Sequence, residues 1–302
     1  MYDVVVIGSL MLDKVSRVGR LPRPSENVYA SSKAVYLGGK GFNQALAAHR
    51  FGAKTLLVGC VGDDEGWDLF REALDKEGMD ANGLHKKEQA TTGQADIWVQ
   101  KDGLNMICAY PGANDLLHPD DFLQKTNEGR YLSFGAGVVL SQLEVPDVAA
   151  RQRCGWTSIL NPAPMRLFDR SMLQDLDYIT PNESEVFALT GIEPVDDASC
   201  AAAGRKLIDE GVKAVIITLG ARGCYWVTER QEIHFLAPAV KAVDTTAAGD
   251  VFNGVLSAMV RGIEKDHAVR YALAAASLST TRPGAAPSVP TRTEVEAFMA
   301  TF

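Results

Sequence analysis

The sequence lacks any apolar run of the roughly 18 residues that a membrane-spanning helix requires. Its opening segment, MYDVVVIGSLMLDK, contains no basic stretch and no small-residue cleavage site, so it does not resemble a secretory signal. Cysteine is scarce, odd in number and never spaced C-x-x-C: the five positions are Cys60, Cys108, Cys154, Cys200 and Cys224. Such cysteines are typical of reduced, mostly buried thiols, and we therefore expect a cytoplasmic protein that does not associate with membranes.

Positive charge is also in short supply. The 302-residue chain has 30 Lys and Arg against 38 Asp and Glu, which gives a net charge of −8. Binding to a nucleic-acid backbone requires a surplus of Lys and Arg, so nucleic acid is not expected as a partner. The five histidines are dispersed along the chain, which argues against a zinc site.

Two well-known nucleotide-binding motifs are missing as well. The chain has no G-x-x-x-x-G-K-[ST] segment, so it is not a P-loop enzyme. The nearest approach to a dinucleotide fingerprint is GKGFNQ at residues 39–44, which lacks the third glycine. A nicotinamide-dependent dehydrogenase is thereby disfavoured.

What the chain does contain is an alternation of apolar strands and helical patterns. Six runs have the length and β-branching of buried parallel strands: Val4–Gly8, Thr55–Val61, Gly137–Ser141, Ser158–Asn161, Tyr178–Pro181 and Ala214–Leu219. Helices are predicted at Gly41–Phe51, Asp64–Glu77, Asn182–Leu189, Asp197–Glu210, Asp250–Val260 and Ala268–Ser279. This alternation predicts an α/β fold with a mostly parallel central sheet covered on both faces.

Two stretches break the alternation. Arg20–Leu37 and Gln94–Tyr110 are typical of short antiparallel strands, and the second has hairpin residues at Lys101-Asp102-Gly103. We therefore expect one domain spanning residues 1–302, with a small β lid formed by about residues 14–38 and 92–112. A lid beside an active site would exclude water during a transfer reaction. A static extension of the sheet edge is the alternative.

The segment Val243–Gly254, VDTTAAGDVFNG, carries the chemistry. Its small residues lead into the helix predicted to begin near Asp250, where unpaired backbone N–H groups and the helix dipole favour an anion. Ala247, Ala248 and Gly249 cannot obstruct a phosphoryl group, so they form a candidate anion hole. Asp250 would face that anion and could accept the proton of a substrate hydroxyl. An ordinary helix N-cap is the alternative for this aspartate.

Six segments, taken in chain order, resemble the signatures of the ribokinase (PfkB) family. They are LGGKGFNQA at 37–45, VGDDEG at 61–66, NPAP at 161–164, TPNESE at 180–185, TLGARG at 218–223 and DTTAAGDVFNG at 244–254. The resemblance spans nearly the whole chain. It implies a three-layer ribokinase-like fold with a small β lid and an ATP-dependent carbohydrate kinase activity. It also implies Mg²⁺ with ATP, K⁺ as an activator, and a homodimer formed through the lid.

The resemblance assigns roles to individual residues around the sugar. It makes Asp250 the base and the backbone before it the anion hole, in agreement with the local pattern. It assigns sugar contacts to Asp13, Gly39, Lys40, Asn43 and Glu144. The polar groups suit sugar hydroxyls, and the glycine permits close approach of the backbone. Taken alone, Lys40 could be a surface lysine and each acid an exposed carboxylate.

Nucleotide and cation sites are implied in the same way. ATP contacts are assigned to Asn182, Glu185, Thr218, Gly220, Gly223 and Gly249, the first two near the phosphates and Mg²⁺. The K⁺ ligands are assigned to Asp244 and Thr246 and to backbone carbonyls of Ser279, Arg282, Gly284 and Ser288. Taken alone, these segments could be a helix cap and plain turns.

One departure from the family pattern bears on the sugar. The family reads Gly-Ser-x-Asn-x-Asp where this chain reads GSLMLD at residues 8–13. An asparagine amide can bond a sugar hydroxyl, whereas the thioether of Met11 is at best a weak acceptor. Because an unpaired buried hydroxyl costs about 1–3 kcal/mol, we expect a deoxypentose, with 2-deoxy-D-ribose phosphorylated at its 5-hydroxyl as the leading candidate. The alternatives are D-ribose with Met11 in the core, another sugar, or a catalytically silent sugar-binding sensor on the same fold.

Overall fold

The computed structural model describes residues 1–102, 104–126, 129–132, 136–146, 156–174 and 176–301. Gly103 of the predicted hairpin turn and Cys154 lie outside the described residues. The other four cysteines are free thiols, of which Cys60, Cys200 and Cys224 are buried and Cys108 is exposed.

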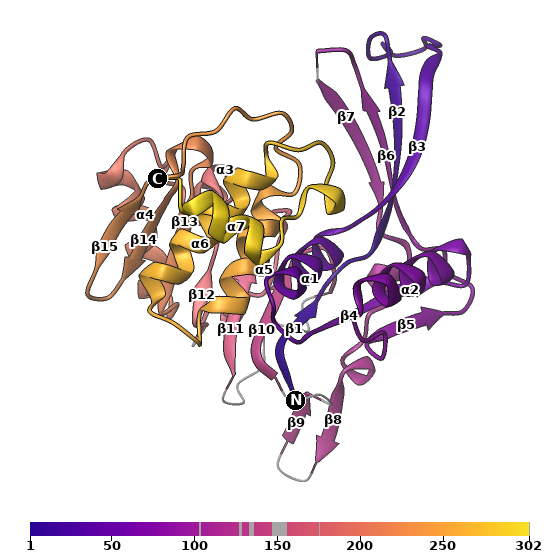
Figure 1. Ribbon diagram of the computed structural model, residues 1–302. Coiled ribbons are helices and arrows are strands. Elements are labelled where there is room, and N and C mark those ends of the chain that lie inside the picture. The colour runs from indigo at the N-terminus through magenta and orange to yellow at the C-terminus, as the bar shows by residue number, and fades with distance from the viewer. Residues whose placement is uncertain (103, 127–128, 133–135, 147–155, 175, 302) are drawn as a thin grey trace.

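The centre of the protein is a nine-stranded sheet in the order β15-β14-β13-β12-β11-β10-β1-β4-β5 (Figure 1). In chain order its strands are β1 (Tyr2–Ile7), β4 (Thr55–Gly62), β5 (Leu84–Lys87), β10 (Ala136–Gln142), β11 (Thr157–Asn161), β12 (Tyr178–Ile179), β13 (Ala214–Thr218), β14 (Cys224–Thr228) and β15 (Glu232–Phe235). All neighbours from β5 to β13 pair in parallel. The six predicted strands are confirmed, and β4 is buried along its whole length because both faces of the sheet are covered.

The edge strands β14 and β15 were not predicted, and they run antiparallel to their neighbours. Only the short turn Leu219–Gly223 joins β13 to β14. A parallel return would need a helical crossover of a dozen or more residues, so the chain comes back antiparallel. The central sheet is therefore mixed at this edge and parallel elsewhere.

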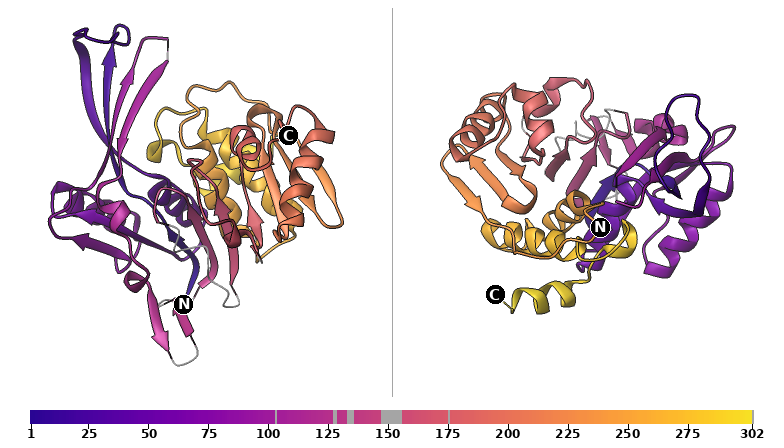
Figure 2. Two further views of the ribbon diagram at one scale, coloured as in Figure 1. Left: turned by 180° about the vertical axis from the view of Figure 1, so that it is seen from behind. Right: turned by 90° about the horizontal axis from the view of Figure 1, so that it is seen from above.

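Helices cover both faces of the sheet, which gives the expected three layers (Figure 2). They are α1 (Lys40–Arg50), α2 (Glu65–Glu77), α3 (Glu183–Thr190), α4 (Asp197–Asp209), α5 (Ala248–Met259), α6 (Lys265–Ser279) and α7 (Arg292–Met299). Helices α1, α2, α5, α6 and α7 share one hydrophobic core, and α3 and α4 pack in another core on the opposite face. In the part of the chain that the structure describes, none of these helices is long and apolar enough to cross a membrane.

A second, four-stranded sheet projects from the main body (Figure 1). This small sheet has the order β3-β2-β6-β7, with β2 (Met11–Val18), β3 (Ala30–Gly38), β6 (Gly93–Val99) and β7 (Asn105–Tyr110). Two expectations are corrected here. Residues 19–29 are not strand, and β2 pairs with β6 in parallel because both strands leave the main body in the same direction. The pair β6–β7 is antiparallel, as expected for Gln94–Tyr110. Strand β2, which lies before the predicted stretch Arg20–Leu37, pairs antiparallel with β3.

Candidate active site

Helix α5 opens on a left-handed residue. Ala247, directly before the helix, has φ 61°, and none of the described side chains caps the helix end. The helix begins at Ala248, slightly earlier than predicted, so Asp250 lies inside the first turn and is not the N-cap. A Cβ placed on Gly249 would meet no atom within 4 Å. The N–H of Ala248 donates to the Thr245 carbonyl at the long distance of 3.3 Å, and the N–H of Gly249 has no backbone acceptor among the described residues. This helix end is therefore accessible to an anion.

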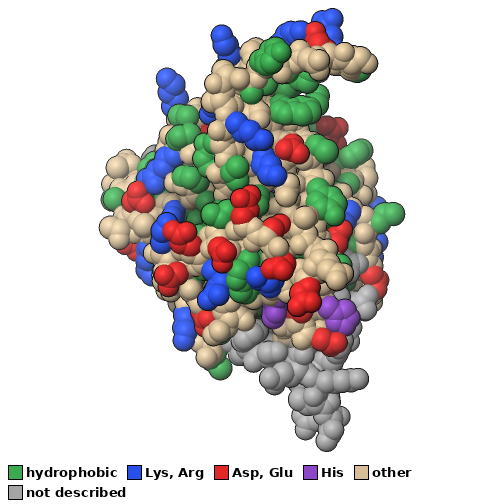
Figure 3. All heavy atoms as spheres, turned by 90° about the vertical axis from the view of Figure 1, so that its right-hand side faces the viewer, with side chains coloured by type: hydrophobic (Ala, Val, Ile, Leu, Met, Phe, Trp, Pro, Cys, Tyr) green, Lys and Arg blue, Asp and Glu red, His purple; other side chains and the backbone are tan. Residues whose placement is uncertain are grey.

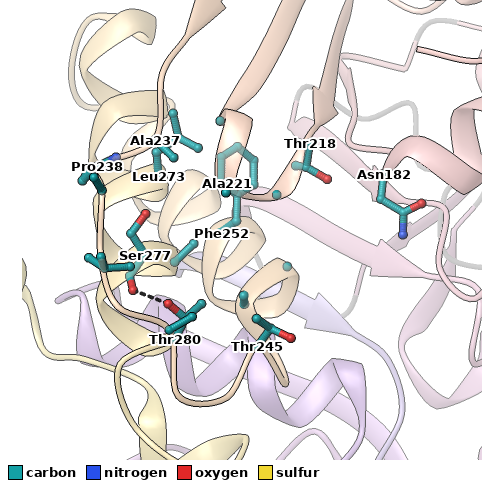
Figure 4. Close-up of a pocket in the computed structure, with 18 of the residues that line it drawn as sticks. Asn182, Thr218, Ala221, Ala237, Pro238, Thr245, Phe252, Leu273, Ser277 and Thr280 are labelled. Atoms are coloured by element: carbon teal, nitrogen blue, oxygen red, sulfur yellow. Dashed lines mark hydrogen bonds between the residues drawn. The ribbon is translucent and has the colours of Figure 1, made fainter. Parts of the chain in front are cut away.

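A cavity of about 760 Å³ lies at this helix end, within the size range of small-molecule sites (Figure 4). Its lining includes five of the six residues predicted to contact ATP: Asn182, Thr218, Gly220, Gly223 and Gly249. Glu185 is the sixth, and it is not among the described lining residues. It lies directly behind Asn182, whose backbone N–H donates to Glu185 Oε2 at 2.8 Å.

The far wall of the cavity was not predicted. It consists of the segment 237–242 together with Phe252 of α5 and Leu273, Ala276, Ser277 and Thr280 in and after α6 (Figure 4). The sequence signal was the run of small residues in Ala268–Ser279, which indicates close helix packing. Small side chains also make room for a ligand, and sequence alone does not separate these two uses.

Asp250 is 6% exposed and is held by the first turn of α1. Gln44 Nε2 donates to Asp250 Oδ1 at 2.9 Å, and Asn43 Nδ2 donates to Asp250 Oδ2 at 3.2 Å. Asn43 was a predicted site residue, whereas Gln44 had been given no role. Segments that lie more than 200 residues apart in the chain thus form one hydrogen-bonded unit.

The close approach of α1 and α5 depends on Gly254, one helical turn after Asp250. A Cβ at this position would overlap the carbonyl oxygen of Gln44 and lie 2.5 Å from Cβ of Ala47. Glycine therefore lets the two helix backbones meet, and the Gln44 amide can reach the Asp250 carboxylate.

Charged side chains interact with Asp250 and with one another: Glu185 is buried, and Asp13, Lys40 and Glu144 are half-buried. Burial raises the pKa of Asp13 to about 7, and the negative charges of Glu144 and Asp250 add to the effect. The Asp250 charge raises the pKa of Lys40, which burial opposes and Glu144 and Glu185 reinforce. Burial also raises the pKa of Glu185. The structure therefore brings Lys40 close to the predicted acidic residues Glu144, Glu185 and Asp250.

Glu144 reaches the same place from the end of β10. Its Oε2 accepts hydrogen bonds from Ser9 Oγ and from the backbone N–H of Lys40, the latter at 3.0 Å. The preceding residue, Gly39, has φ 92°, and a Cβ there would meet the backbone of Ser9 and Met11. Glycine is required at this position because the conformation and the close contact exclude a side chain.

Met11 is 9% exposed and lies at the base of the small sheet. Asn114 Nδ2 approaches its Sδ at 3.4 Å, and Asn114 also holds the backbone of Leu10 through both sides of its amide. A Cβ on Gly93 would lie 2.5 Å from the same sulfur. The methionine is thus packed at the point where β2 enters the small sheet, and Asn114 is a supporting residue that the sequence did not reveal.

The predicted cation ligands lie where two loops meet. Asp244 Oδ1 accepts from Thr246 N at 2.9 Å, and Asp244 Oδ2 accepts from Gly284 N at 2.8 Å. The guanidinium of Arg282 pairs with Glu294 at 2.7 Å. Ser279 and Ser288 lie in the same region, each with its hydroxyl bonded to a carbonyl three residues earlier.

The raised pKa of Asp13 predicts a pH-dependent stability difference. The carboxyl has a pKa of about 7 when folded against 3.8 ordinarily, so its contribution to stability is complete below about pH 4 and is lost as the pH rises through 7. Asp13→Asn removes this loss. Thermal unfolding should show Asp13→Asn gaining about 3–6 °C on the native protein between pH 5 and pH 8. If the difference in Tm between Asp13→Asn and the native protein is the same at pH 5 and at pH 8, the pKa of Asp13 is not raised by folding.

Known proteins resemble the chain over nearly its full length. The family model for pfkB family carbohydrate kinases matches residues 1–292. The ribokinase of Haemophilus influenzae is 36% identical over 303 residues, which cover 98% of each chain. The deoxyribokinase of Salmonella typhi is 34% identical over 297 residues, which cover 95% of each chain.

Solved structures agree with these relatives. The crystal structure of ribokinase from Thermotoga maritima has a TM-score of 0.85 and 36% identity, covering 99% of this chain and 100% of that one. The structure of Arabidopsis thaliana ribokinase complexed with ribose and ATP has a TM-score of 0.87 and 31% identity, covering 99% and 98%. Both the fold and the family that the sequence motifs resemble are thereby confirmed. The chain belongs to the pfkB family of carbohydrate kinases, and it is an ATP-dependent carbohydrate kinase that uses a divalent metal with ATP.

Proposed function

We propose that the protein transfers the γ-phosphoryl group of ATP to the 5-hydroxyl of a pentose, with 2-deoxy-D-ribose as the preferred substrate. The observation that carries the reaction is the placement of Asp250. Its carboxylate is held by Asn43 and Gln44 in the first turn of α5, directly after Gly249, which lines a cavity large enough for a nucleotide.

In the proposed reaction, Asp250 accepts the proton of the sugar hydroxyl as the hydroxyl oxygen attacks the γ-phosphorus. The bond from phosphorus to the bridging oxygen breaks, and ADP leaves. The backbone of Ala247, Ala248 and Gly249 holds the charge on the migrating group. Lys40, which interacts with Asp250 and is half-buried, adds positive charge at the site.

The proposed nucleotide site is the cavity lined by Asn182, Thr218, Gly220 and Gly223. Asn182 and Glu185 would hold the divalent ion that accompanies ATP. This role fits Glu185, because a buried carboxyl with a raised pKa is stabilised as the anion by a nearby cation. The metal would neutralise charge on the phosphates. The residues that line the cavity would position the nucleotide.

The proposed sugar site lies between α1 and the start of β2. Asp13, Gly39, Lys40, Asn43 and Glu144 would contact the sugar. Asn43 supports this placement, since its Oδ1 is buried and has no hydrogen-bond partner among the described residues. A sugar hydroxyl would supply the missing donor.

The preference for deoxyribose rests on Met11. Its thioether is a weak acceptor, and it is packed against Asn114, whose amide is already bonded to two backbone carbonyls. A 2-hydroxyl pressed against this pair would find no free partner, whereas a sugar without it would lose nothing. D-Ribose is the alternative substrate.

A substitution series tests the preference. For the native protein we expect kcat/KM for 2-deoxy-D-ribose to exceed that for D-ribose by about 5–100-fold, which corresponds to about 1–3 kcal/mol. Met11→Asn should reduce or reverse this ratio in assays with fixed ATP. Met11→Leu is the matched control, and it should keep the preference because it adds no polar group. A strong ribose preference in the native protein, unchanged by Met11→Asn, would end the deoxyribose proposal.

The same assay separates the remaining alternatives. A panel of other sugars tests for a different acceptor, and ATP turnover with any of them excludes a silent sugar sensor. Repeating the assay without K⁺ tests the proposed activator site at Asp244, Thr246 and the carbonyls of residues 279–288. The hydrogen bond from the Gly284 N–H to Asp244 Oδ2 supports this site, because it brings the two loops together.

We further propose that the chain is one domain whose small sheet is the β lid, and that two copies pair through it. Exposed hydrophobic side chains on the small sheet support this pairing: Val35, Tyr36, Met106, Ile107 and Tyr110. Figure 3 shows hydrophobic side chains interspersed with lysines and arginines over the projecting part of the molecule. The free cysteines are compatible with a cytoplasmic location.

A further inference from the structure

A chain of buried amide side chains connects Asp250 to the central sheet. Gln44 Nε2 donates both to Asp250 Oδ1 at 2.9 Å and to Asn161 Oδ1 at 3.1 Å. Gln142 Nε2 donates to Gln44 Oε1 at 2.7 Å, and Asn161 Nδ2 donates to the Thr180 carbonyl at 3.2 Å. Gln142 ends β10 and Asn161 ends β11, so the chain joins the sheet edge to α5 through α1.

The partners of Gln44 fix the orientation of its amide. Its side chain is fully buried, so no water competes for its groups. Reversing the amide would set Oε1 against the Asp250 carboxylate and Nε2 against the Gln142 Nε2 donor. The first contact would be repulsive because a carboxylate only accepts, and Oε1 would also face the acceptor Asn161 Oδ1. The donor of Gln44 therefore points at Asp250 Oδ1.

The two carboxylate oxygens of Asp250 are held differently. Oδ1 accepts from Gln44 Nε2, and the Gln44 amide also bonds to Gln142 and Asn161. Oδ2 is bound at the longer distance of 3.2 Å by Asn43, whose Oδ1 still lacks a partner. Asn43 can turn its amide to a sugar and release Oδ2, whereas the Gln44 amide nitrogen is already held between Asp250 and Asn161.

We propose that Gln44 is the positioning residue for Asp250: it holds Oδ1 so that Oδ2 faces the acceptor hydroxyl. This inference rests on the proposed function, in which Asp250 is the base. Gln44 does not contact the sugar or the nucleotide in this scheme, and it acts only through the orientation of the carboxylate. An uncharged amide suits this task, because it adds donors without altering the charge of the site.

The test replaces Gln44 by methionine, which has a similar length and no donor. Gln44→Met should lower kcat by about 10–100-fold, because the carboxylate can then turn away from the hydroxyl. The KM values for sugar and for ATP should stay within about 3-fold of the native values, since neither ligand contacts Gln44. A kcat within 3-fold of native would overturn the proposal.

Gln142→Met is the matched control. It breaks the same buried chain, but the Gln44 bond to Asp250 remains. Both variants should lose similar thermal stability, whereas Gln142→Met should keep kcat within about 3-fold. Equal losses of kcat in the two variants would mean that any disruption of the buried network slows the enzyme. The proposal that Gln44 positions Asp250 would then be wrong. If Gln44→Met does not fold, Gln44→Asn carries the test, because it retracts the amide by one methylene and keeps its polarity.

A double substitution separates this inference from the proposed function. In the Asp250→Asn background, adding Gln44→Met should reduce the remaining rate by less than about 2-fold, because the group that it positions is gone. If Gln44→Met lowers the rate of Asp250→Asn as much as it lowers the rate of the native protein, Gln44 does not act through Asp250. If Asp250→Asn alone retains the native rate, the proposed base itself is wrong, and this outcome is distinct from a failure confined to Gln44.

Discussion

We expect the replacement of Asp250 by asparagine to lower kcat by about 10²–10⁴-fold, the range that general-base catalysis supplies. The amide is nearly the same size as the carboxylate and can still accept from Gln44, so the packing of α1 against α5 is retained. It has no basic oxygen for the hydroxyl proton. Steady-state assays with saturating sugar and ATP measure the loss directly.

Two further measurements identify the cause of that loss. ATP affinity, measured by calorimetry, should be nearly unchanged, because Asp250 is not among the described residues that line the nucleotide cavity. Asp196→Asn is the matched control: Asp196 caps α4 by accepting from Ser199 N, and asparagine caps helices equally well. That variant should keep native activity. A retained rate above about a tenth of native in Asp250→Asn would remove this residue from the role of base.

Gly254→Ala should damage both stability and catalysis. The added methyl group would overlap the α1 backbone at Gln44 and crowd Ala47. Overpacking of this kind costs about 1–3 kcal/mol, which exceeds the helix-propensity gain of about 1 kcal/mol from glycine to alanine. If the helices separate to relieve the overlap, the hydrogen bonds that hold Asp250 lengthen, and kcat should fall by about 10-fold or more. Thermal unfolding and steady-state kinetics measure the two effects.

Gly249→Ala is the comparison for stability, since it lies in the same helix and its methyl group would meet no atom within 4 Å. Its Tm should equal or exceed the native value, because alanine favours the helix. If Gly254→Ala is as stable and as active as the native protein, the helix contact does not constrain the site.

The strands of the central sheet were predictable because burial on both faces leaves a continuous apolar run, as in β1 and β4. Strand β2 escaped prediction because its exposure is mixed, and one of its two neighbours, β6, comes from a distant part of the chain. The parallel pairing of β2 with β6 depends on how two separated segments leave the main body, and no local pattern encodes that arrangement.

The site was predictable to the extent that its residues share local motifs. Asp250 and the small residues before it form one such motif, and the structure places them at an open helix end. Gln44 lies inside a recognised motif, yet its role depends on a partner 206 residues away. Asn114 supports Met11 across 103 residues and belongs to no recognised motif. Contacts of this kind are set by packing, which the sequence does not display.

The base of the small sheet is a single row in which Gly38 and Gly93 flank Met11. Asp13 follows two residues later on the same strand, so the projecting sheet and the proposed sugar contacts are one continuous piece of backbone. If the small sheet changes its tilt when a sugar binds, the tilt and the binding affect each other by the same free energy. A partner bound at the far end of the sheet would then change the affinity for the sugar.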